Sequence, residues 1–419
     1  MEPDHHLLRA ATEEVIGPAG RRWGWSGLLR EKHYLYYLAG NTVSWIGTWA
    51  QRIGISWLSW SLTHRAVWVG AVSTATVLPL MVFGPLFGTL LDRHDHRRYA
   101  LGVNASLALL ALALYFLTTL HIMRIELLCV MAVFVGIANS AYQAVRLVMV
   151  NDVVARKHLA AAIAINSLLY NLIRAVGPAI AGVIIAGYGV AATFAANSVS
   201  YLGILIALCF VHLKSHERRG SSGGLISDSV AGLKYVRAHP TLRQLLLLSG
   251  VTSIMGRGVI ELMPAFADGS FHRGSVGLAD LTTAVGVGAV AGAAVLSVGW
   301  SLYAITRIAT ISVGGGVVLF GLCTAFPAAL VMATVLGMAV VSCGVGLQVL
   351  LQLQVGAGYR GRVLGIWTAV NVSGPGLGGA LIGLLSQFVG LKSAALCAGL
   401  ACLVLVTLIR QRPLGPATA

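Results

Sequence analysis

The sequence predicts an all-α membrane protein with twelve transmembrane helices in two pseudo-symmetric six-helix bundles. Charged residues make up only 10% of the 419 residues, and the mean hydropathy is +0.82. Soluble globular domains contain about a quarter charged residues. Twelve apolar stretches are long enough to cross a bilayer, which takes about 20 residues in a helix. One long polar interruption, at residues 213–240, separates the first six stretches from the last six.

Each predicted span corresponds to one apolar stretch, and most connections between the spans are short. The spans are expected near residues 34–60, 67–91, 99–120, 126–148, 159–186, 190–212, 241–267, 278–300, 304–325, 328–352, 362–388 and 392–409. Membrane β-strands would instead alternate apolar and polar residues over segments of about ten residues. Because the sequence lacks this alternation, it favours helices.

The 29 Lys and Arg residues are distributed unevenly along the predicted topology. With the N-terminus inside the cell, four basic residues lie outside the cell: Arg65, Arg124, Arg273 and Lys392. Four more lie within predicted spans: Arg52, Arg146, Arg174 and Arg257. The others lie in cytoplasmic segments. Cytoplasmic loops carry an excess of basic residues. The sequence therefore predicts a multi-pass inner-membrane protein with both termini cytoplasmic. Its net charge of +15 points to anionic lipid of the inner leaflet as a partner, and not to nucleic acid.

The sequence contains no pattern typical of a catalytic or cofactor site. All six cysteines lie inside apolar spans without metal-ligand spacing, so we expect buried thiols, no metal and no cofactor. Walker loops and nucleophile elbows are absent. The chain is therefore not expected to be an enzyme, and it cannot be an ATP-driven pump by itself.

Five segments are expected along the chain. They are a cytoplasmic N-terminal segment (1–33), an N-terminal six-helix bundle (34–212), a cytoplasmic linker with an amphipathic helix (213–240), a C-terminal six-helix bundle (241–410) and a cytoplasmic tail (411–419). An internal echo supports the two bundles, because Gly-Pro followed by small residues occurs both in RAVGPAIAG (Arg174–Gly182) and in NVSGPGLGG (Asn371–Gly379). Repeat-built transporters contain such interrupted helices at corresponding positions.

The segment between the second and third spans is the most specific motif. It reads GPLFGTLLDRHDHRRY (Gly84–Tyr99), in which glycines, an acid and a cluster of bases join two spans in a short hairpin. This segment resembles the loop motif of the major facilitator superfamily. The first span (Leu38–Thr63), the segment Val145–Gly182 and ELMPAFADG (Glu261–Gly269) are similar to the transmembrane secretion effector branch of that superfamily. The resemblance implies the major facilitator fold, and export of a small organic molecule by proton antiport with alternating access, in a protein that works as a monomer.

The resemblance also implies roles for individual residues. Asp92 and Arg93 match the acid and base of a cytoplasmic latch, and Arg146 matches an arginine expected to pair with Asp92. Gly177 and Pro178 match a motif of the fifth span associated with antiporters. The loop departs from the family pattern at His94-Asp95-His96, where Asp95 adds an acid and leaves the partner of each arginine open.

Two charged residues of the seventh predicted span are candidates for proton coupling or gating. Glu261 is the acid that lies well inside a predicted span, and Arg257 precedes it by four residues, on the same face of a regular helix. An ionisable residue inside a membrane is a functional candidate by default. Glu261 would carry the coupling proton on one interpretation. On the other, Arg257 and Glu261 form a permanent structural ion pair.

Arg52 is the third candidate for gating. It belongs to a polar stripe on the first predicted span, which consists of Asn41, Trp45, Thr48, Arg52 and Ser59. Arg52 and Glu261 lie at similar depths in spans that are equivalent in the repeat. We hypothesise that they meet across a central cavity in one conformation and separate in the other. The alternative is that Arg52 extends to the outer headgroups.

Aromatic, amide and basic residues in the spans are candidates to line a substrate cavity. They are Asn41, Trp45, Thr48, Tyr142, Gln143, Tyr170, Asn171, Arg174, Gln348, Gln352, Trp367 and Asn371. Asn171 and Arg174 suit an anionic or catecholate-like substrate, or they satisfy carbonyl groups freed near Pro178. For any single candidate, helix packing remains an alternative.

Together these features predict a proton-coupled secondary exporter of a small amphiphilic molecule, with a siderophore-like metabolite as the first choice. Broad-specificity drug efflux is the alternative within the same class. A non-transporting membrane sensor or scaffold is the alternative from another class, but it would need neither a buried Glu261 nor a polar stripe in a cavity.

Overall fold

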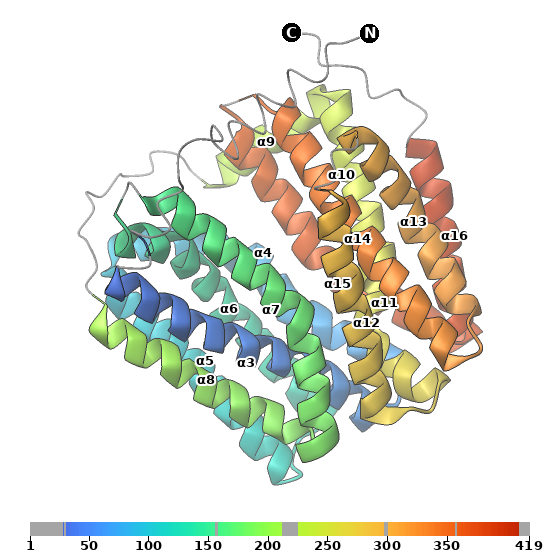
Figure 1. Ribbon diagram of the computed structural model, residues 1–419, viewed down its shortest axis with the longest axis horizontal. Coiled ribbons are helices and arrows are strands. Elements are labelled where there is room, and N and C mark those ends of the chain that lie inside the picture. The colour runs from blue at the N-terminus through green and yellow to red at the C-terminus, as the bar shows by residue number, and fades with distance from the viewer. Residues whose placement is uncertain are drawn as a thin grey trace.

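The computed structural model describes residue 28 and residues 31–155, 158–211, 225–296, 301–356 and 358–409. Every secondary-structure element within these ranges is a helix. The long helices form two groups that lie side by side and diverge toward one end of the molecule (Figure 1). The first group contains α3 (Lys32–Thr63), α4 (Ala66–Arg93), α5 (His96–Thr119), α6 (Ile125–Val153), α7 (Leu159–Tyr188) and α8 (Val190–Phe210).

The second group follows the linker. It contains α9 (Leu225–Ala238), α10 (Pro240–Thr252), η2 (Ser253–Arg257), α11 (Gly258–Glu261), η3 (Ala265–Ser270), α12 (Gly274–Val295), α13 (Leu302–Leu322), α14 (Phe326–Gln354), α15 (Arg360–Val389) and α16 (Leu391–Ile409). The seventh predicted span is thus not one regular helix. Two π-helical segments, η2 and η3, flank the four-residue α11.

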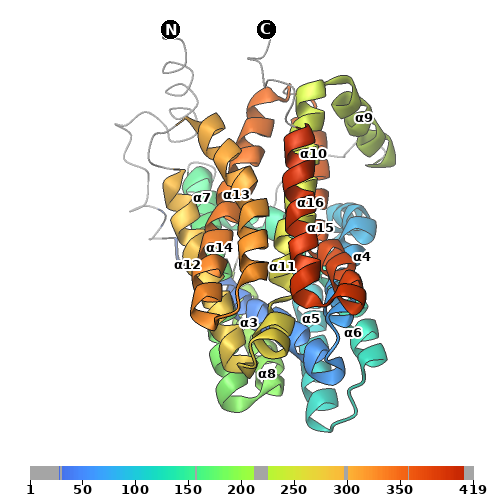
Figure 2. The same ribbon diagram turned by 90° about the vertical axis from the view of Figure 1, so that its right-hand side faces the viewer.

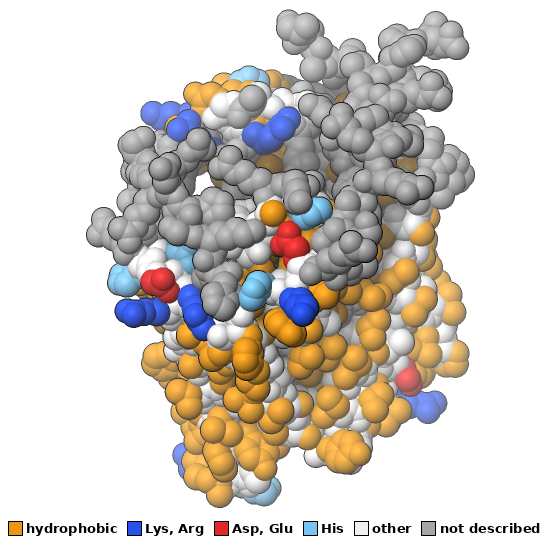
Figure 3. Space-filling model, turned by 60° about the vertical axis from the view of Figure 1, so that its left-hand side comes forward, with side chains coloured by type: hydrophobic (Ala, Val, Ile, Leu, Met, Phe, Trp, Pro, Cys, Tyr) orange, Lys and Arg blue, Asp and Glu red, His pale blue; other side chains and the backbone are white. Residues whose placement is uncertain are grey.

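Ten of the described helices are long and apolar enough to cross a membrane. On the face shown in Figure 3, apolar side chains cover most of the lower part, whereas most of the charged side chains lie in the upper part, with a few near the opposite end. The two predicted spans outside this set are α3 and the broken segment from α10 to η3. The first carries a polar stripe with Arg52, and the second is divided by its π-helical turns. The all-helical class is confirmed, whereas the count of twelve spans stays a prediction.

Two turns at corresponding places in the chain have the same backbone conformation. Gly189 between α7 and α8 has φ 81° and ψ 167°, and Gly390 between α15 and α16 has φ 82° and ψ 158°. Positive φ values of this kind favour glycine, which has no Cβ. The helix pairs joined by these turns are the ones that carry the two Gly-Pro segments. The repeated sequence motif is thus accompanied by a repeated turn conformation.

The two groups meet where the predicted Gly-Pro segments lie. Helix α15 packs along α4, and α12 packs along α7. Added Cβ atoms would lie 2.2 Å from Ala380 N at Gly70, 2.6 Å from Ala66 O at Gly383, and 2.2 Å from Ala279 Cβ at Gly182. Small residues allow such close approach of helix backbones. These contacts lie at the end where α3 and α7 terminate and α4 and α12 begin, which we call the closed end.

We expect Gly70→Val to destabilise the protein, because no side chain fits between α4 and α15 at this position. Overpacking of a tight interface costs about 1–3 kcal/mol. The measurement is thermal unfolding of the purified protein. Gly102→Val on α5 is the matched control, because an added Cβ meets nothing within 4 Å there. Equal unfolding temperatures for the two variants would contradict the proposed tight contact.

The predicted linker helix is present as α9, which lies at one end of the second group and at an angle to its long helices (Figure 2). Its described part contacts α15 and the connection that precedes it. The ring of Tyr235 stacks on Tyr359 with centroids 4.2 Å apart, and Gly232 lies against Arg362. Val236 is buried and Leu233 is exposed. One apolar face of α9 therefore packs on the second group, and another apolar side chain of the helix remains exposed.

Candidate functional site

A cavity of about 170 Å³ lies between the two helix groups, mostly on the side of the first group. It is lined by residues of α3, α4 and α6, with single residues from α7, α8, α11 and α15. Its polar and aromatic lining consists of Trp45, Thr48, Trp49, Gln51, Arg52, Ser56, Ser73, Thr76, Asn139, Tyr142, Gln143, Arg146, Tyr170, Tyr201 and Glu261. Glu261 is the acidic side chain of this lining.

Arg52 and Glu261 join the two groups at this cavity. Arg52 Nη2 lies 2.5 Å from Glu261 Oε1, and Ser73 Oγ donates a hydrogen bond of 3.0 Å to Glu261 Oε2. The Arg52 guanidinium also lies 5.2 Å from the centroid of the Trp49 ring. The Glu261 side chain is 15% exposed and that of Arg52 is 41% exposed. The contact expected from the polar stripe is therefore formed, between α3 and α4 of one group and α11 of the other.

A second polar network continues along the cavity wall, away from Glu261. Trp45 Nε1 donates to Tyr142 OH at 2.8 Å, and Tyr142 OH donates to Asn41 Oδ1 at 3.0 Å. The Tyr170 ring packs edge-on against Trp45 and lies 4.4 Å below the guanidinium of Arg146. These contacts place a cation and several aromatic faces on one wall, an arrangement that suits a flat anionic or amphiphilic solute.

The expected ion pair between Arg257 and Glu261 is not formed. Among the described residues, Glu261 pairs with Arg52 instead. The interpretation as a permanent pair is therefore wrong for this conformation. The i, i+4 argument assumes a regular helix, whereas Arg257 ends a π-helical turn with a wider hydrogen-bond spacing. Arg257 lies against Gly344 of α14, while Glu261 faces α3 and α4.

The predicted cytoplasmic latch lies partly outside the described residues. The side chains of Asp92 and Arg93 are not described, and the described contact of the Arg146 guanidinium is with Tyr170 in the cavity. Asp95 is the N-cap of α5, where its side chain accepts a hydrogen bond from Arg98 N at 2.8 Å. It thus has a capping role that the sequence interpretation missed.

The same end contains a contact between a histidine and an aspartate that the sequence interpretation also missed. His96 Nδ1 lies 2.6 Å from Asp152 Oδ2, joining the start of α5 to the last turn of α6. The Asp152 side chain is 6% exposed. The usable signal is an acid placed just beyond the predicted end of the fourth span, opposite the basic loop.

The two residues of the predicted antiporter motif lie inside α7. A Cβ on Gly177 would lie 2.6 Å from Trp49 Cβ, so this glycine allows close packing of α7 on α3 beside the cavity. Pro178 lies within the helix. The geometry gives the motif a packing role, and its part in antiport stays a prediction.

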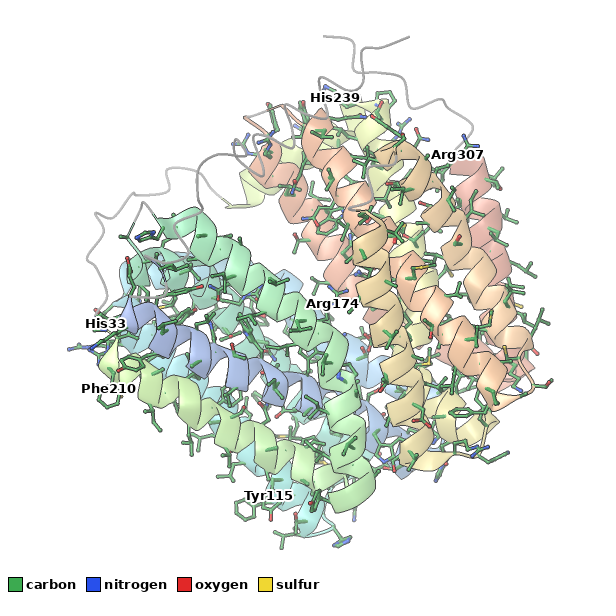
Figure 4. All side chains as sticks on the ribbon, in the orientation of Figure 1. His33, Tyr115, Arg174, Phe210, His239 and Arg307 are labelled. Atoms are coloured by element: carbon green, nitrogen blue, oxygen red, sulfur yellow. The ribbon has the colours of Figure 1, made fainter. Side chains whose placement is uncertain are left out.

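The other predicted cavity residues lie at different places. Trp45, Thr48, Tyr142, Gln143 and Tyr170 line the cavity. Asn41 is buried behind it and accepts from Tyr142. Arg174 faces the second helix group from α7 (Figure 4). Like Asn41 and Arg174, the remaining predicted residues Gln348, Gln352, Trp367 and Asn371 lie outside the lining, and the side chain of Asn171 is not described.

Several lining residues were missed by the sequence interpretation. Asn139 precedes Gln143 and Arg146 by four and seven residues on α6, which is helical spacing and a usable signal. Ser73 gave no signal, because a single serine in an apolar span usually serves packing. The described part of the chain contains no group of three His, Cys, Asp or Glu residues that could hold a metal ion.

The closed end is held by a further contact between the groups. Trp60 Nε1 at the end of α3 donates a hydrogen bond of 2.8 Å to Asp268 Oδ2 in η3, and His64 Nδ1 lies 3.8 Å from the same oxygen. Gly269 lies directly against the Trp60 ring, where an added Cβ would approach to 2.7 Å. The hydrogen bond between Trp60 and Asp268 must therefore break if the two groups separate at this end.

We expect Asp268→Asn to weaken the closed end, because the charge-assisted hydrogen bond becomes a neutral one. Hydrogen bonds with an ionised partner are roughly twice as strong as neutral ones. The measurement is alkylation of a single cysteine introduced at Ser56 in the cavity, by a membrane-impermeant reagent added from the side of the closed end. Labelling should become faster in Asp268→Asn than in the parent. Asp280→Asn on α12 is the control, and equal labelling rates in all three proteins would refute the expected weakening.

The family model for transmembrane secretion effectors matches residues 24–418. The chain belongs to the transmembrane secretion effector family. Its curated relatives include the enterobactin exporter of Escherichia coli, 25% identical over 356 residues that cover 83% of this chain and 84% of the relative. An uncharacterized MFS-type transporter of Bacillus subtilis is 24% identical over 91% of this chain and 94% of its own length. The family assignment confirms the resemblance to the major facilitator superfamily, so the protein is a multi-pass membrane transporter.

The staphyloferrin A transporter of Staphylococcus aureus is 24% identical over 238 residues, which cover 56% of this chain and 59% of that protein. Among solved structures, the nucleoside transporter NupG aligns with a TM-score of 0.71 at 13% identity, covering 91% of this chain and 99% of that one. A bacterial homologue of the iron transporter ferroportin, in an inward-facing state, aligns with a TM-score of 0.67 at 14% identity, covering 91% and 99%. These likenesses show the fold of membrane transporters.

Proposed function

We propose that this family member is a proton-coupled secondary exporter of a small amphiphilic organic molecule, a siderophore-like metabolite, that works by alternating access in the inner membrane. The observation that carries the proposal is the contact of Arg52 with Glu261 at the edge of a cavity between the two helix groups. A carboxylate that joins two moving groups inside a membrane is suited to couple proton binding to their separation.

The proposed mechanism uses two states of Glu261. With the carboxylate bound to Arg52 and Ser73, the two groups are tied together near the closed end. An anionic substrate that binds Arg52 competes with Glu261, which weakens this tie and lets the groups part at the closed end. The freed Glu261 then takes up a proton from that side, and Arg52 displaces the proton to the opposite side when the groups close again, so that protons enter as substrate leaves. Arg257 takes no part in this step.

The charge of the cavity favours an anionic substrate. Arg52 and Arg146 face it with Glu261 as the opposing charge, and the rings of Trp45, Trp49 and Tyr170 supply flat apolar surfaces. Carboxylates and catecholates form forked hydrogen bonds with guanidinium groups. Two relatives, the enterobactin exporter of Escherichia coli and the staphyloferrin A transporter of Staphylococcus aureus, support a siderophore-like cargo.

The size of the cavity sets a condition on this cargo. Typical pockets for drug-sized ligands measure about 300–1,000 Å³, whereas this cavity measures about 170 Å³. A siderophore-sized molecule therefore requires the helix groups to part further than in the described conformation. Broad-specificity drug efflux is the second candidate, favoured by the many aromatic and aliphatic residues of the lining.

A comparison of spent media tests the substrate class. A strain that lacks the gene and its parent are grown under iron limitation, and the chelators in medium and cells are compared by mass spectrometry. We expect one iron-binding metabolite to accumulate in the cells of the deletion strain and to return to the medium on complementation. Unchanged chelators together with increased sensitivity to unrelated drugs would instead support efflux. Identical metabolites and drug sensitivity in both strains would contradict export.

A further inference from the structure

Arg257 is a cation that the proposed transport step does not use. It lies in the second helix group at the end of η2, and a Cβ on Gly344 of α14 would be 3.3 Å from its Nη2. No carboxylate of the described residues lies within 4 Å of its guanidinium. A guanidinium inside a membrane protein is costly without an opposite charge or acceptors. Among the described residues, this arginine therefore has no carboxylate in direct contact.

A small second cavity lies beside Arg257. Its volume is about 10 Å³, which is room for about one water-sized species. It is lined by Thr252, Ser253, Arg257, Val313, Val340, Gly344 and Asn371. The main cavity shares none of these residues, so the two are separate sites.

The hydrogen-bonding groups of the small cavity leave donors in excess. Ser253 is 2% exposed, and its Oγ has no partner among the described residues. The other polar groups are already occupied, because Thr252 Oγ1 donates to Leu248 O at 2.8 Å and Asn371 Nδ2 donates to Ser249 Oγ at 2.7 Å. A buried hydroxyl without a partner costs free energy. The donors that remain are the hydroxyl of Ser253 and the guanidinium of Arg257.

The surrounding charges make this place favourable for an anion. Arg174 and Arg52 act on Arg257 as like charges through space, and Glu261 acts as an opposite charge. Arg174 reaches toward this group of helices from α7 (Figure 4). Since Glu261 is already bound to Arg52, the local excess is positive. The π-helical turn of η2, a distortion often found at functional sites, holds both Ser253 and Arg257.

We propose that the small cavity binds one halide-sized inorganic anion, such as chloride, between the guanidinium of Arg257 and the hydroxyl of Ser253. A water molecule would satisfy the hydroxyl but would not balance the charge. A carboxylate or sulfate consists of several heavy atoms and needs more room than this space, whereas a halide is a single atom. The anion fixes the π-helical segment η2, which directly precedes the α11 turn that carries Glu261, and the site is independent of whether the main cavity takes a siderophore.

The test is thermal unfolding of the purified full-length protein in sodium chloride, sodium bromide or sodium gluconate at equal ionic strength, without substrate. We expect chloride and bromide to raise the unfolding temperature saturably, by about 2 °C or more over gluconate, because a ligand that binds only the folded state stabilises it. Arg257→Gln should remove this halide response. Arg307→Gln, an exposed arginine on α13, should keep it.

Ser253→Ala keeps the arginine and removes one donor, so it provides a second variant if Arg257→Gln does not fold. A hydrogen bond with a charged partner contributes about 1.5–3 kcal/mol, so we expect the halide concentration for half-maximal response to rise at least about tenfold. Absence of a response in the parent, or an equal response in the parent, Arg257→Gln and Ser253→Ala, would overturn the proposal. Because the readout requires no transport, it remains valid whether or not the proposed export is correct.

Discussion

Glu261→Gln should abolish export driven by a pH gradient while substrate binding remains measurable. Glutamine has nearly the shape of glutamate and keeps an oxygen for Arg52 and Ser73, but it cannot bind and release the coupling proton. We expect the rate driven by a pH gradient in proteoliposomes to fall at least about tenfold, which corresponds to about 1.4 kcal/mol. Counterflow of substrate across the same membrane, which needs no net proton movement, should be retained.

The control is Glu126→Gln, which changes an exposed glutamate in the first turn of α6. Glu126 takes no part in the contact between Arg52 and Glu261. This variant should transport at the rate of the parent. Undiminished pH-driven export by Glu261→Gln would end the assignment of Glu261 as the proton carrier. Equal loss in both assays would instead indicate that the substitution damages the cavity itself.

Exchange of the two charges, Arg52→Glu with Glu261→Arg, should restore part of the export that each single change removes. Either single variant leaves two like charges facing one another at the junction of α3 and α11, and like charges in a medium of low dielectric constant repel strongly. The double variant restores one cation and one anion. We expect both single variants to lose at least about tenfold in rate, and the exchange to recover a measurable fraction.

The measurement is a double-mutant cycle on export rate and on thermal stability, which isolates the pairwise term for residues in contact. Arg146→Glu combined with Glu261→Arg is the matched control, because Arg146 contacts Tyr170 and not Glu261. Strictly additive losses in the Arg52 and Glu261 cycle would contradict coupling between them. Rescue by the Arg146 control as well would show that only the net charge of the cavity matters.

Hydropathy alone predicted nearly all long helices within a few residues, because an apolar run of about 20 residues has one stable arrangement in a bilayer. Helix ends were predicted less well. The fourth predicted span ends at residue 148, whereas α6 continues to Val153, since Asn151 and Asp152 are compatible with a helix that leaves the apolar layer. The fold class therefore followed from composition, but the ends depend on capping and on contacts such as His96 with Asp152.

The candidate site was predictable in part for a similar reason. The Arg52 contact followed from the depth and spacing of polar residues on a regular helix. The expected Arg257 contact failed because the direction of a side chain depends on helix register, and a π-helical turn changes that register without a clear sequence signal. Gln348, Gln352 and Trp367 were placed in the cavity from polarity alone, although the rotation of each helix is set by packing against its neighbours.

The glycine-rich contact between α4 and α15 has a consequence for the speed of opening. Glycine and alanine have no side-chain rotamers to rearrange, so parting these surfaces requires little reorganisation of interdigitated side chains. Much of the energy barrier to opening then comes from a few polar contacts. These are the contacts of Arg52 and Ser73 with Glu261 and of Trp60 with Asp268. The activation enthalpy of opening should therefore reflect these few polar contacts more than the glycine-rich interface.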